Sequence, residues 1–155
     1  MATTARPQDL YDELRTSHEI QRTLCTSLTR ARTPDARRDT LRELDVELAA
    51  HAAAEERFLY APMLMDDAGL SSSRHALAEH HEMEELVEEL RGIDPSSDEW
   101  IETAKELTHE VRHHLKEEER AFFQISGKIL TDRQKATLAG RYRRDYERMK
   151  RKLAG

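Results

Sequence analysis

The segment LRELDVELAAHAAAEERFL, residues 41–59, has apolar side chains at the spacing of an amphipathic α-helix. One stripe of this helix carries a histidine and a glutamate among its apolar residues: Leu41, Leu44, Leu48, His51, Glu55, Phe58 and Leu59. An ionised carboxylate on a buried stripe is strongly destabilising unless it is paired or bound to a metal. The segment therefore predicts a buried helix in which His51 and Glu55 are candidate metal ligands.

A histidine on an apolar stripe occurs in three further segments. The four residues, His18, His51, His80 and His114, are 33, 29 and 34 positions apart, which suits one long helix plus a turn. The midpoints between them fall near 34.5, 65.5 and 97, close to breaks marked by Thr33-Pro34, by Asp66 ahead of Gly69, and by Ser96-Ser97. In an up-down-up-down bundle this mirror symmetry places all four histidines at one height.

The composition favours an all-α fold. Charged residues make up 36% of the 155 residues and aromatic residues only 5%, with five glycines and four prolines, so little material is available for a sheet. Capping residues and helix breakers predict helices over residues 8–31, 34–65, 71–91, 97–126 and 132–152. Their signals are Pro7, Thr33-Pro34, the serines Ser71–Ser73, Gly92, the capping box Ser96/Glu99, Gly127, and the capping box Thr131/Gln134.

These helices predict one domain over residues 1–155. A four-helix bundle is expected over about residues 8–127, with Pro62 bending the end of its second helix. A C-terminal helix over about residues 132–152 is expected to pack across one end of the bundle.

Charge and targeting signals set limits on location and partners. The net charge of −6 argues against a dedicated nucleic-acid binder, although seven basic residues lie between Arg141 and Lys152. The acid-rich third and fourth helices offer an intramolecular partner for this basic helix. No apolar run is long enough to span a membrane, the N-terminus lacks the apolar core of a signal peptide, and Cys25 is the only cysteine. A cytoplasmic protein is expected; its oligomeric state stays open.

Histidine and glutamate four positions apart also form ordinary surface pairs. Because the pairs His75-Glu79, His81-Glu85 and His113-Glu117 lie off the apolar stripes, they are expected to be solvated. His51-Glu55 and His114-Glu118 lie on the buried stripes, at the level of two more core histidines, and this arrangement indicates a metal site.

The donor types indicate which metals suit this site. Imidazole with carboxylate suits iron, manganese, zinc or copper, and no cysteine cluster is available for an iron–sulfur centre. Four histidines and two or three carboxylates are too many for one tetrahedral ion, so a dinuclear centre with a bridging carboxylate is predicted. A ferritin-like centre needs a Glu-x-x-His motif on each of two helices, and here the motif occurs only on the fourth, as Glu106-His109 and Glu110-His113.

These motifs resemble those of the hemerythrin-like HHE cation-binding domain. The resemblance covers about residues 8–126 and rests on His18-Glu19, HAAAEERFLYAPML (51–64), EHHEMEELVEEL (79–90) and HLKEEERAFF (114–123). It implies a four-helix bundle that holds two iron ions, bridged by carboxylate and by an oxo or hydroxo group. Family members bind dioxygen or react with nitric oxide, peroxide or damaged iron centres. The matching ligand positions are His18, His51, Glu55, His80, His114 and Glu118.

The third helix departs from the oxygen-carrying hemerythrins, which have a second histidine one turn after the first. Here that position is Glu84, and the apolar stripe of the third helix continues through either Met83 or Glu84. A seventh ligand at Glu84 would give four histidines and three carboxylates, a set that favours ferric iron and argues against reversible oxygen carriage. His81 is the rival of His80 on this helix, and the stripe favours His80.

Four further residues are candidate neighbours of the site. Tyr11 and Cys25 lie seven positions from His18 on the same helical face; Tyr11 either donates a hydrogen bond toward the site or fills the core, and Cys25 is expected to be a buried core residue. Glu56 and Glu119 are expected to be surface charges or to lie just outside the ligands.

The sequence therefore predicts a di-iron protein that binds or reacts with a small oxidant: dioxygen, hydrogen peroxide or nitric oxide. As an enzyme it would consume peroxide or nitric oxide. The alternatives are an oxygen, redox or iron sensor, an iron-handling protein without turnover, and a structural bundle that binds zinc. Zinc and manganese are the alternative metals.

Overall fold

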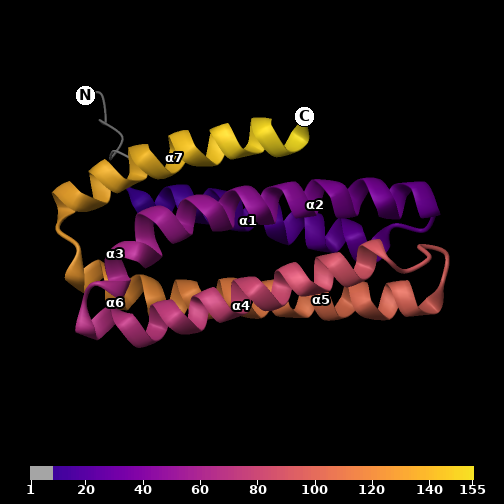
Figure 1. Ribbon diagram of the computed structural model, residues 1–155, viewed down its shortest axis with the longest axis horizontal. Helices are drawn as coiled ribbons and strands as arrows, with labels where there is room; N and C mark the ends of the chain where they lie inside the picture. Colours follow the sequence, from indigo (N-terminus) through magenta and orange to yellow (C-terminus); the bar gives the residue numbers. More distant parts are fainter. Residues whose placement is uncertain (1–8) are drawn as a thin grey trace, which may run out of the picture.

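The structure is a computed structural model that describes residues 9–155, and within this range it contains helices and no β-strand. Four long helices, α1 (Leu10–Arg30), α2 (Pro34–Glu55), α4 (Asp67–Arg91) and α5 (Asp98–Glu117), run up and down and form the bundle (Figure 1). The long C-terminal helix α7 (Asp132–Ala154) lies outside this bundle. The predicted all-α bundle with an additional C-terminal helix is confirmed.

Local capping sets several helix boundaries. The predicted opening at Pro7 lies outside the described residues, and α1 begins after Asp9, whose side chain and that of Asp12 form a reciprocal capping box. Thr33 caps α2 ahead of Pro34, and Thr131 caps α7 with Gln134, both as predicted. The cap of α5 is Ser97, one residue beyond the predicted Ser96.

The start of α4 differs from the prediction, which placed a turn at Gly69 and a cap in the serine run. Asp66 caps this helix by accepting from the Ala68 N–H, so Gly69 lies in its first turn. A Cβ on Gly69 would lie 2.8 Å from the Met63 carbonyl oxygen, so only glycine allows the helix to approach the preceding segment this closely. Ser73 is buried and donates to the Gly69 carbonyl.

Two π-helical segments interrupt the bundle. The first, η1 (Glu56–Tyr60), continues α2 and is followed by the short helix α3 (Ala61–Leu64), in which Pro62 occupies the first turn. The second, η2 (Glu118–Phe122), joins α5 to α6 (Phe123–Ile129). The α6 helix runs through Gly127, so the predicted stop at this glycine was wrong. Such π segments often occur at functional sites.

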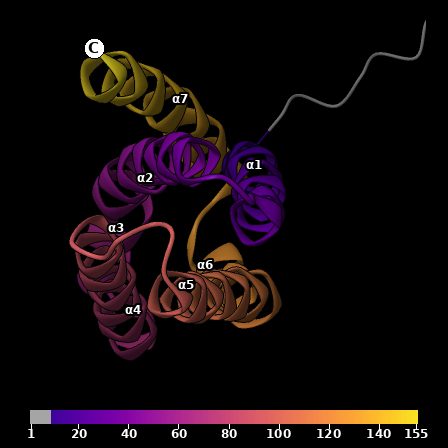
Figure 2. The same cartoon turned by 90° about the vertical axis from the view of Figure 1, so that its right-hand side faces the viewer.

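The C-terminal helix α7 packs lengthwise against α1 and α2, on the side of the bundle away from α4 and α5 (Figures 1 and 2). The prediction that it packs across one end was wrong. Its basic residues pair with Glu13 of α1, with Glu47 of α2 and with acids of α7 itself, through Arg143, Lys150 and Arg148 among others, and its Asp145 also binds Arg57 of η1. The acid-rich helices α4 and α5 therefore do not pair with it.

The apolar core is split into two clusters. One contains Leu10, Leu14, Leu59 and Phe123, and the other contains Leu28, Leu44, Val87, Trp100 and Leu107, among others. Within the described range, no helix combines the length and the apolar character needed to cross a membrane.

Candidate metal centre

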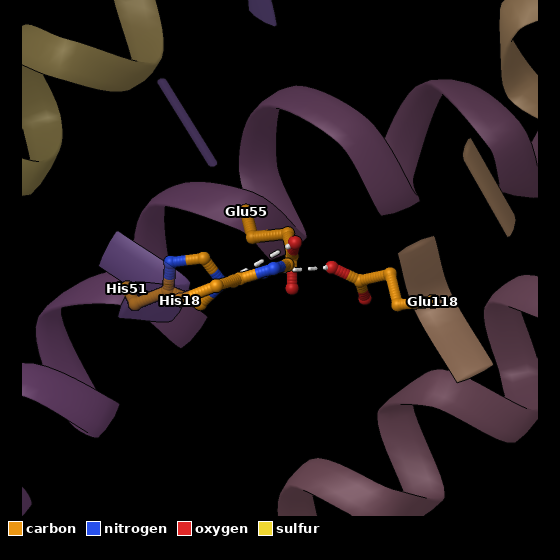
Figure 3. A group of neighbouring side chains, drawn as sticks. All are labelled: His18, His51, Glu55 and Glu118. Carbon is orange, nitrogen blue, oxygen red and sulfur yellow. Dashed lines mark ion pairs between the residues drawn. The ribbon is translucent and has the colours of Figure 1, made fainter. Parts of the chain in front are cut away.

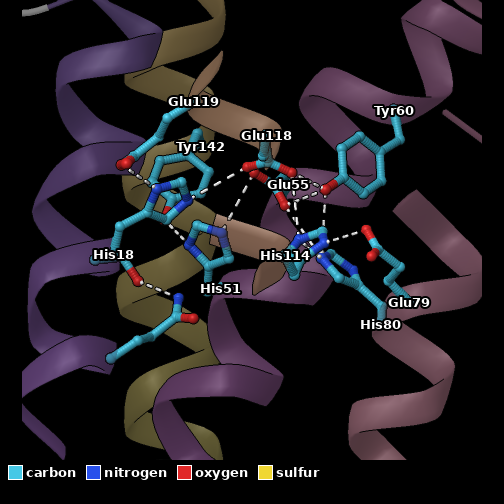
Figure 4. Close-up of polar contacts among 12 residues, drawn as sticks. His18, His51, Glu55, Tyr60, Glu79, His80, His114, Glu118, Glu119 and Tyr142 are labelled. Atoms are coloured by element: carbon cyan, nitrogen blue, oxygen red, sulfur yellow. Dashed lines mark hydrogen bonds and ion pairs between the residues drawn. The ribbon is translucent and has the colours of Figure 1, made fainter. Parts of the chain in front are cut away.

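Six buried polar side chains converge inside the bundle (Figure 4). The four histidines His18, His51, His80 and His114 come from α1, α2, α4 and α5 and are at most 8% exposed. Glu55 ends α2 and Glu118 opens η2, and both are at most 3% exposed. The structure thus brings together six of the seven residues singled out in the sequence, His18, His51, Glu55, His80, His114 and Glu118.

The six side chains form two groups that share both carboxylates. In the first group, His18 Nε2 lies 3.3 Å from Glu118 Oε1 and His51 Nε2 lies 3.3 Å from Glu55 Oε2 (Figure 3). In the second, His80 Nε2 lies 3.3 Å from Glu55 Oε1 and His114 Nε2 lies 3.4 Å from Glu118 Oε2. Each carboxylate therefore directs one oxygen toward each histidine pair, as a ligand that bridges two cations would.

The first group consists of atoms that lack hydrogen-bond partners. His18 Nε2, His51 Nε2, Glu55 Oε2 and Glu118 Oε1 are all buried, and beyond their ion-pair contacts of 3.3 Å none of them makes a hydrogen bond. A buried polar atom without a partner costs about 1–3 kcal/mol, and more if it is charged. Donors that each bind one ion at about 2.0–2.2 Å lie roughly 3.0–3.5 Å apart, which matches the observed spacing. These four atoms fit a metal ion.

The second group has a fifth polar side chain beside it, which the sequence did not predict and which donates hydrogen bonds to the two carboxylates. The Tyr60 hydroxyl donates to Glu55 Oε1 at 2.6 Å and to Glu118 Oε2 through a shorter contact, and it lies 3.3 Å from His80 Nε2. Burial, together with the charges of Glu118 and Glu55, raises the pKa of Tyr60 well above its usual value. In the metal-free chain this phenol is protonated, and it holds the two carboxylates together.

The helical geometry explains why Tyr60 was missed. Five residues along a regular α-helix correspond to a rotation of about 140°, which would point Tyr60 away from Glu55. Residues Glu56–Tyr60 are π-helical, and this wider turn brings the phenol back to the preceding carboxylate.

Comparison with known proteins agrees with this geometry. A family model for the hemerythrin HHE cation-binding domain matches residues 9–125. The chain belongs to the hemerythrin HHE family. The resemblance seen in the sequence is thereby confirmed, and the family and the buried His/Glu groups identify a cation-binding domain.

Two similar proteins extend the comparison. The crystal structure of a hemerythrin HHE cation-binding domain-containing protein from Mycobacterium kansasii, a homologue of Rv2633c, superposes with a TM-score of 0.82. The two chains are 22% identical, and the match covers 94% of this chain and 89% of the other. A protein of Nostoc sp. described as a DNA nickase is 26% identical over 147 residues. That match covers 95% of this chain but only 42% of the relative.

In this HHE domain every histidine of the centre has a hydrogen-bond partner on its outer nitrogen. The Nδ1 atoms of His18, His51, His80 and His114 lie 2.9, 2.9, 3.0 and 2.9 Å from Glu119, Tyr142, Glu56 and Glu79. Such contacts fix the ring orientation and direct the opposite nitrogen toward a metal. The alternative that Glu56 and Glu119 lie just outside the ligands agrees with these contacts.

Two of these four partners were not expected. Glu79 was predicted to be a solvated surface charge, but it is only 8% exposed and binds His114. Tyr142 lies on α7, and its contact with His51 depends on the lengthwise packing of that helix. No local sequence pattern connects a residue on the last helix with a histidine 91 positions earlier.

The carboxylates change the protonation of the histidines in the metal-free HHE domain. Burial opposes the charged form of His18, but its contacts with the carboxylates of Glu118 and Glu119 outweigh this effect and raise its pKa to about 9. His114 has the same balance of effects with Glu118 and Glu79, and its pKa is raised to about 10. Although burial favours the neutral acid, the neighbouring histidines, His51 first, hold the pKa of Glu55 well below its usual range.

The remaining candidates lie away from the centre. Glu84 is exposed and belongs to neither group, and Met83 instead follows the buried stripe of α4. His81 is exposed and pairs with Glu85 at 2.9 Å. The Tyr11 hydroxyl shares a 2.8 Å hydrogen bond with Ser126, so it faces α6, and Cys25 is a fully buried core residue.

Two cavities reach the centre of this HHE domain from the side of α4. One, of about 320 Å³, lies between α4 and the α5–η2 segment and is bordered by His114 and Glu118. The other, of about 510 Å³, lies between α2 and α4 and is bordered by His51 and His80. The donor atoms themselves are buried, so a reactant must be small to approach them.

Proposed function

We propose that this chain binds two iron ions in the shared His/Glu centre and that this centre reacts with a small oxidant: dioxygen, hydrogen peroxide or nitric oxide. The observation that carries the proposal is the sharing of Glu55 and Glu118, whose oxygens divide between two histidine pairs. Carboxylates shared in this way offset the repulsion between two neighbouring cations.

The donor set favours iron over zinc. Besides four imidazoles it contains two carboxylates, which are hard oxygen donors that suit ferric iron. Glu84, the predicted seventh ligand, is exposed, and the Tyr60 hydroxyl lies 3.3 Å from His80 Nε2. When bound, a pair of iron ions supplies the electrons that reduce the oxidant.

The surrounding side chains orient the histidine rings, and Tyr60 holds a proton beside the centre. Glu56, Glu79, Glu119 and Tyr142 fix the outer nitrogens of the four histidines. The Tyr60 hydroxyl oxygen lies 2.6 Å from Glu55 Oε1, and its raised pKa keeps its proton in place at neutral pH until a more basic oxygen is nearby.

Burial of the centre selects against large substrates. Two metal ions can also cleave phosphodiester bonds, and the similar Nostoc protein is described as a DNA nickase. Here every metal-binding side chain of the centre is at most 8% exposed. A DNA backbone therefore cannot contact these side chains unless the bundle opens. Because the chain also spans about two fifths of that relative, we favour a small oxidant over DNA as the reactant.

Metal analysis combined with an optical spectrum tests the proposal. We expect about two irons per natively purified chain and a charge-transfer band that changes when peroxide is added. His114→Ala should lose bound iron and the band, whereas His81→Ala, which alters an exposed histidine, should keep both. Zinc in place of iron, or no bound metal, would contradict the proposal.

The same experiment separates an enzyme from a sensor. Steady consumption of peroxide or nitric oxide that is lost in His114→Ala identifies an enzyme. A spectral change that is reversed when the ligand is removed, without consumption, identifies a sensor. Iron that transfers readily to another apoprotein identifies an iron-handling role.

A further inference from the structure

A second cluster of metal-binding side chains lies outside the buried centre. His75 and Glu79 of α4 and Glu117 of α5 each direct one donor atom to the same place, with all three atoms within 4.8 Å of one another. His113 of α5 flanks the two carboxylates. We call His75, Glu79, His113 and Glu117 the outer cluster.

The distances in the outer cluster suit a metal ion. His75 Nε2 lies 3.6 Å from Glu79 Oε2 and 3.5 Å from Glu117 Oε1. His113 Nε2 lies 3.2 Å from Glu117 Oε2 and 3.9 Å from Glu79 Oε2. Two donors on one tetrahedral zinc ion lie about 3.3 Å apart, since each bond is about 2.0–2.1 Å long. Three of the four separations, 3.6, 3.5 and 3.2 Å, lie close to this value.

Ordinary surface pairing does not account for this arrangement. An exposed histidine–glutamate pair needs one carboxylate, as in His81-Glu85, whereas here carboxylates from two helices converge on the same imidazole. In the described chain, the ion-pair partners of Glu79 and Glu117 are histidines, with no lysine or arginine among them. A divalent cation would remove the repulsion between the two carboxylates.

The outer cluster is connected to the buried centre in two ways. Glu79 directs Oε2 to the outer cluster while its Oε1 binds Nδ1 of His114 at 2.9 Å. The cavity of about 320 Å³ is bordered by His75, Glu79 and Glu117 and also by the inner residues His114 and Glu118. His75 is 60% exposed, so the outer cluster faces solvent at one end of this cavity.

We propose that the outer cluster is a third metal site, which takes a divalent transition-metal ion from solution and passes it through this cavity to the buried centre. Its imidazole and carboxylate donors match those of the inner groups, so an ion exchanges its ligands without a change in donor type. This inference extends the proposed function, because it presumes an inner centre that binds metal.

Zinc binding measures the number of sites. The metal-free chain is dialysed against Zn²⁺ alone at about pH 7.5, and bound zinc is counted. We expect three ions for the wild-type chain and two for the double variant His75→Ala/Glu117→Gln. The matched control His81→Ala/Glu85→Gln removes another exposed pair, six residues further along α4 than His75, and should keep three.

Cobalt measures the transfer. One equivalent of Co²⁺ is mixed with metal-free chain, and filling of the inner centre is followed by the visible absorption of the bound ion. We expect filling to be several-fold slower in His75→Ala/Glu117→Gln than in the wild type and in the control. Equal rates in all three proteins would overturn the loading role.

The zinc counts also separate this inference from the proposed function. A wild-type count of two, or an unchanged count of three in the double variant, would overturn the outer site while the inner centre stands. A wild-type count of one that falls to zero in the double variant would support the outer site and contradict the proposed inner centre.

Discussion

The metal-free chain holds protons on the nitrogens that a metal must bind, so metal binding should release protons. His18 has a pKa of about 9 and His114 a pKa of about 10. At pH 7 both rings are doubly protonated, and their Nε2 atoms lie 3.3 and 3.4 Å from the oxygens of Glu118. Because His18 belongs to one group and His114 to the other, each bound ion must expel at least one proton.

The pKa values set the size of the effect. At pH 7 deprotonation costs about 3 kcal/mol for His18 and about 4 kcal/mol for His114, at 1.36 kcal/mol per pKa unit. For each proton expelled, the apparent dissociation constant should fall about tenfold with every pH unit up to pH 9. Binding should therefore strengthen as pH rises, and the pH dependence should flatten once both rings are neutral.

Isothermal titration with Zn²⁺ measures the protons directly. Titrations at pH 7 in two buffers with different ionisation enthalpies should show that at least two protons leave when the inner centre fills. Glu119→Gln removes a charged partner that raises the pKa of His18, so proton release at pH 8 should decrease, whereas Glu85→Gln on the exposed α4 surface should change nothing. An affinity independent of pH, or an enthalpy independent of buffer, would refute this reasoning.

Three further predictions concern stability and ring support. In the metal-free chain the raised pKa of His18 contributes stability that is present below its unfolded value of 6.5 and is lost as pH rises through about 9. Urea unfolding with a chelator should therefore show less stability above pH 9 than at pH 6, with about 3 kcal/mol of the loss due to His18 and a further loss due to His114; a gain with pH would contradict the assignment. Tyr142→Phe removes the contact to His51 and should weaken zinc affinity by roughly 10–100-fold in competition with a chelator; unchanged affinity would show that α7 plays no part in metal binding. Gly69→Ala should destabilise the domain by about 1–3 kcal/mol in thermal unfolding, because the added Cβ would meet a main-chain carbonyl oxygen. Gly92→Ala should destabilise it less, because a Cβ there would lie 3.6 Å from its nearest atom. Equal losses of stability in the two variants would count against the close approach at Gly69.

Regular helices explain how much of the centre could be predicted. Within an α-helix, stripe position identifies the buried histidine, and the midpoints between histidines locate the turns. His18, His51, Glu55, His114 and Glu118 depend on these two regularities alone, and the structure brings them together. Capping by Thr33 and by Thr131 was equally predictable, because each cap depends on a few neighbouring residues.

The parts that escaped prediction depend on departures from this regularity. Tyr60 reaches Glu55 only because Glu56–Tyr60 is π-helical, and a sequence of helix-forming residues does not reveal that wider turn. Positions three and four after His80 are both compatible with a helical stripe, and the packing of α4 buries Met83 rather than Glu84. Tyr142 depends on tertiary packing between distant helices.

The position of Tyr142 on α7 has a consequence for biosynthesis. Chains are translated from the N-terminus, so all six inner donors leave the ribosome before α7 does. A bundle that collapsed at that stage would carry His51 without its partner on Nδ1 and would hold metal weakly. Docking of α7 should then tighten the centre, so firm metal capture is expected only once this helix has packed against the bundle.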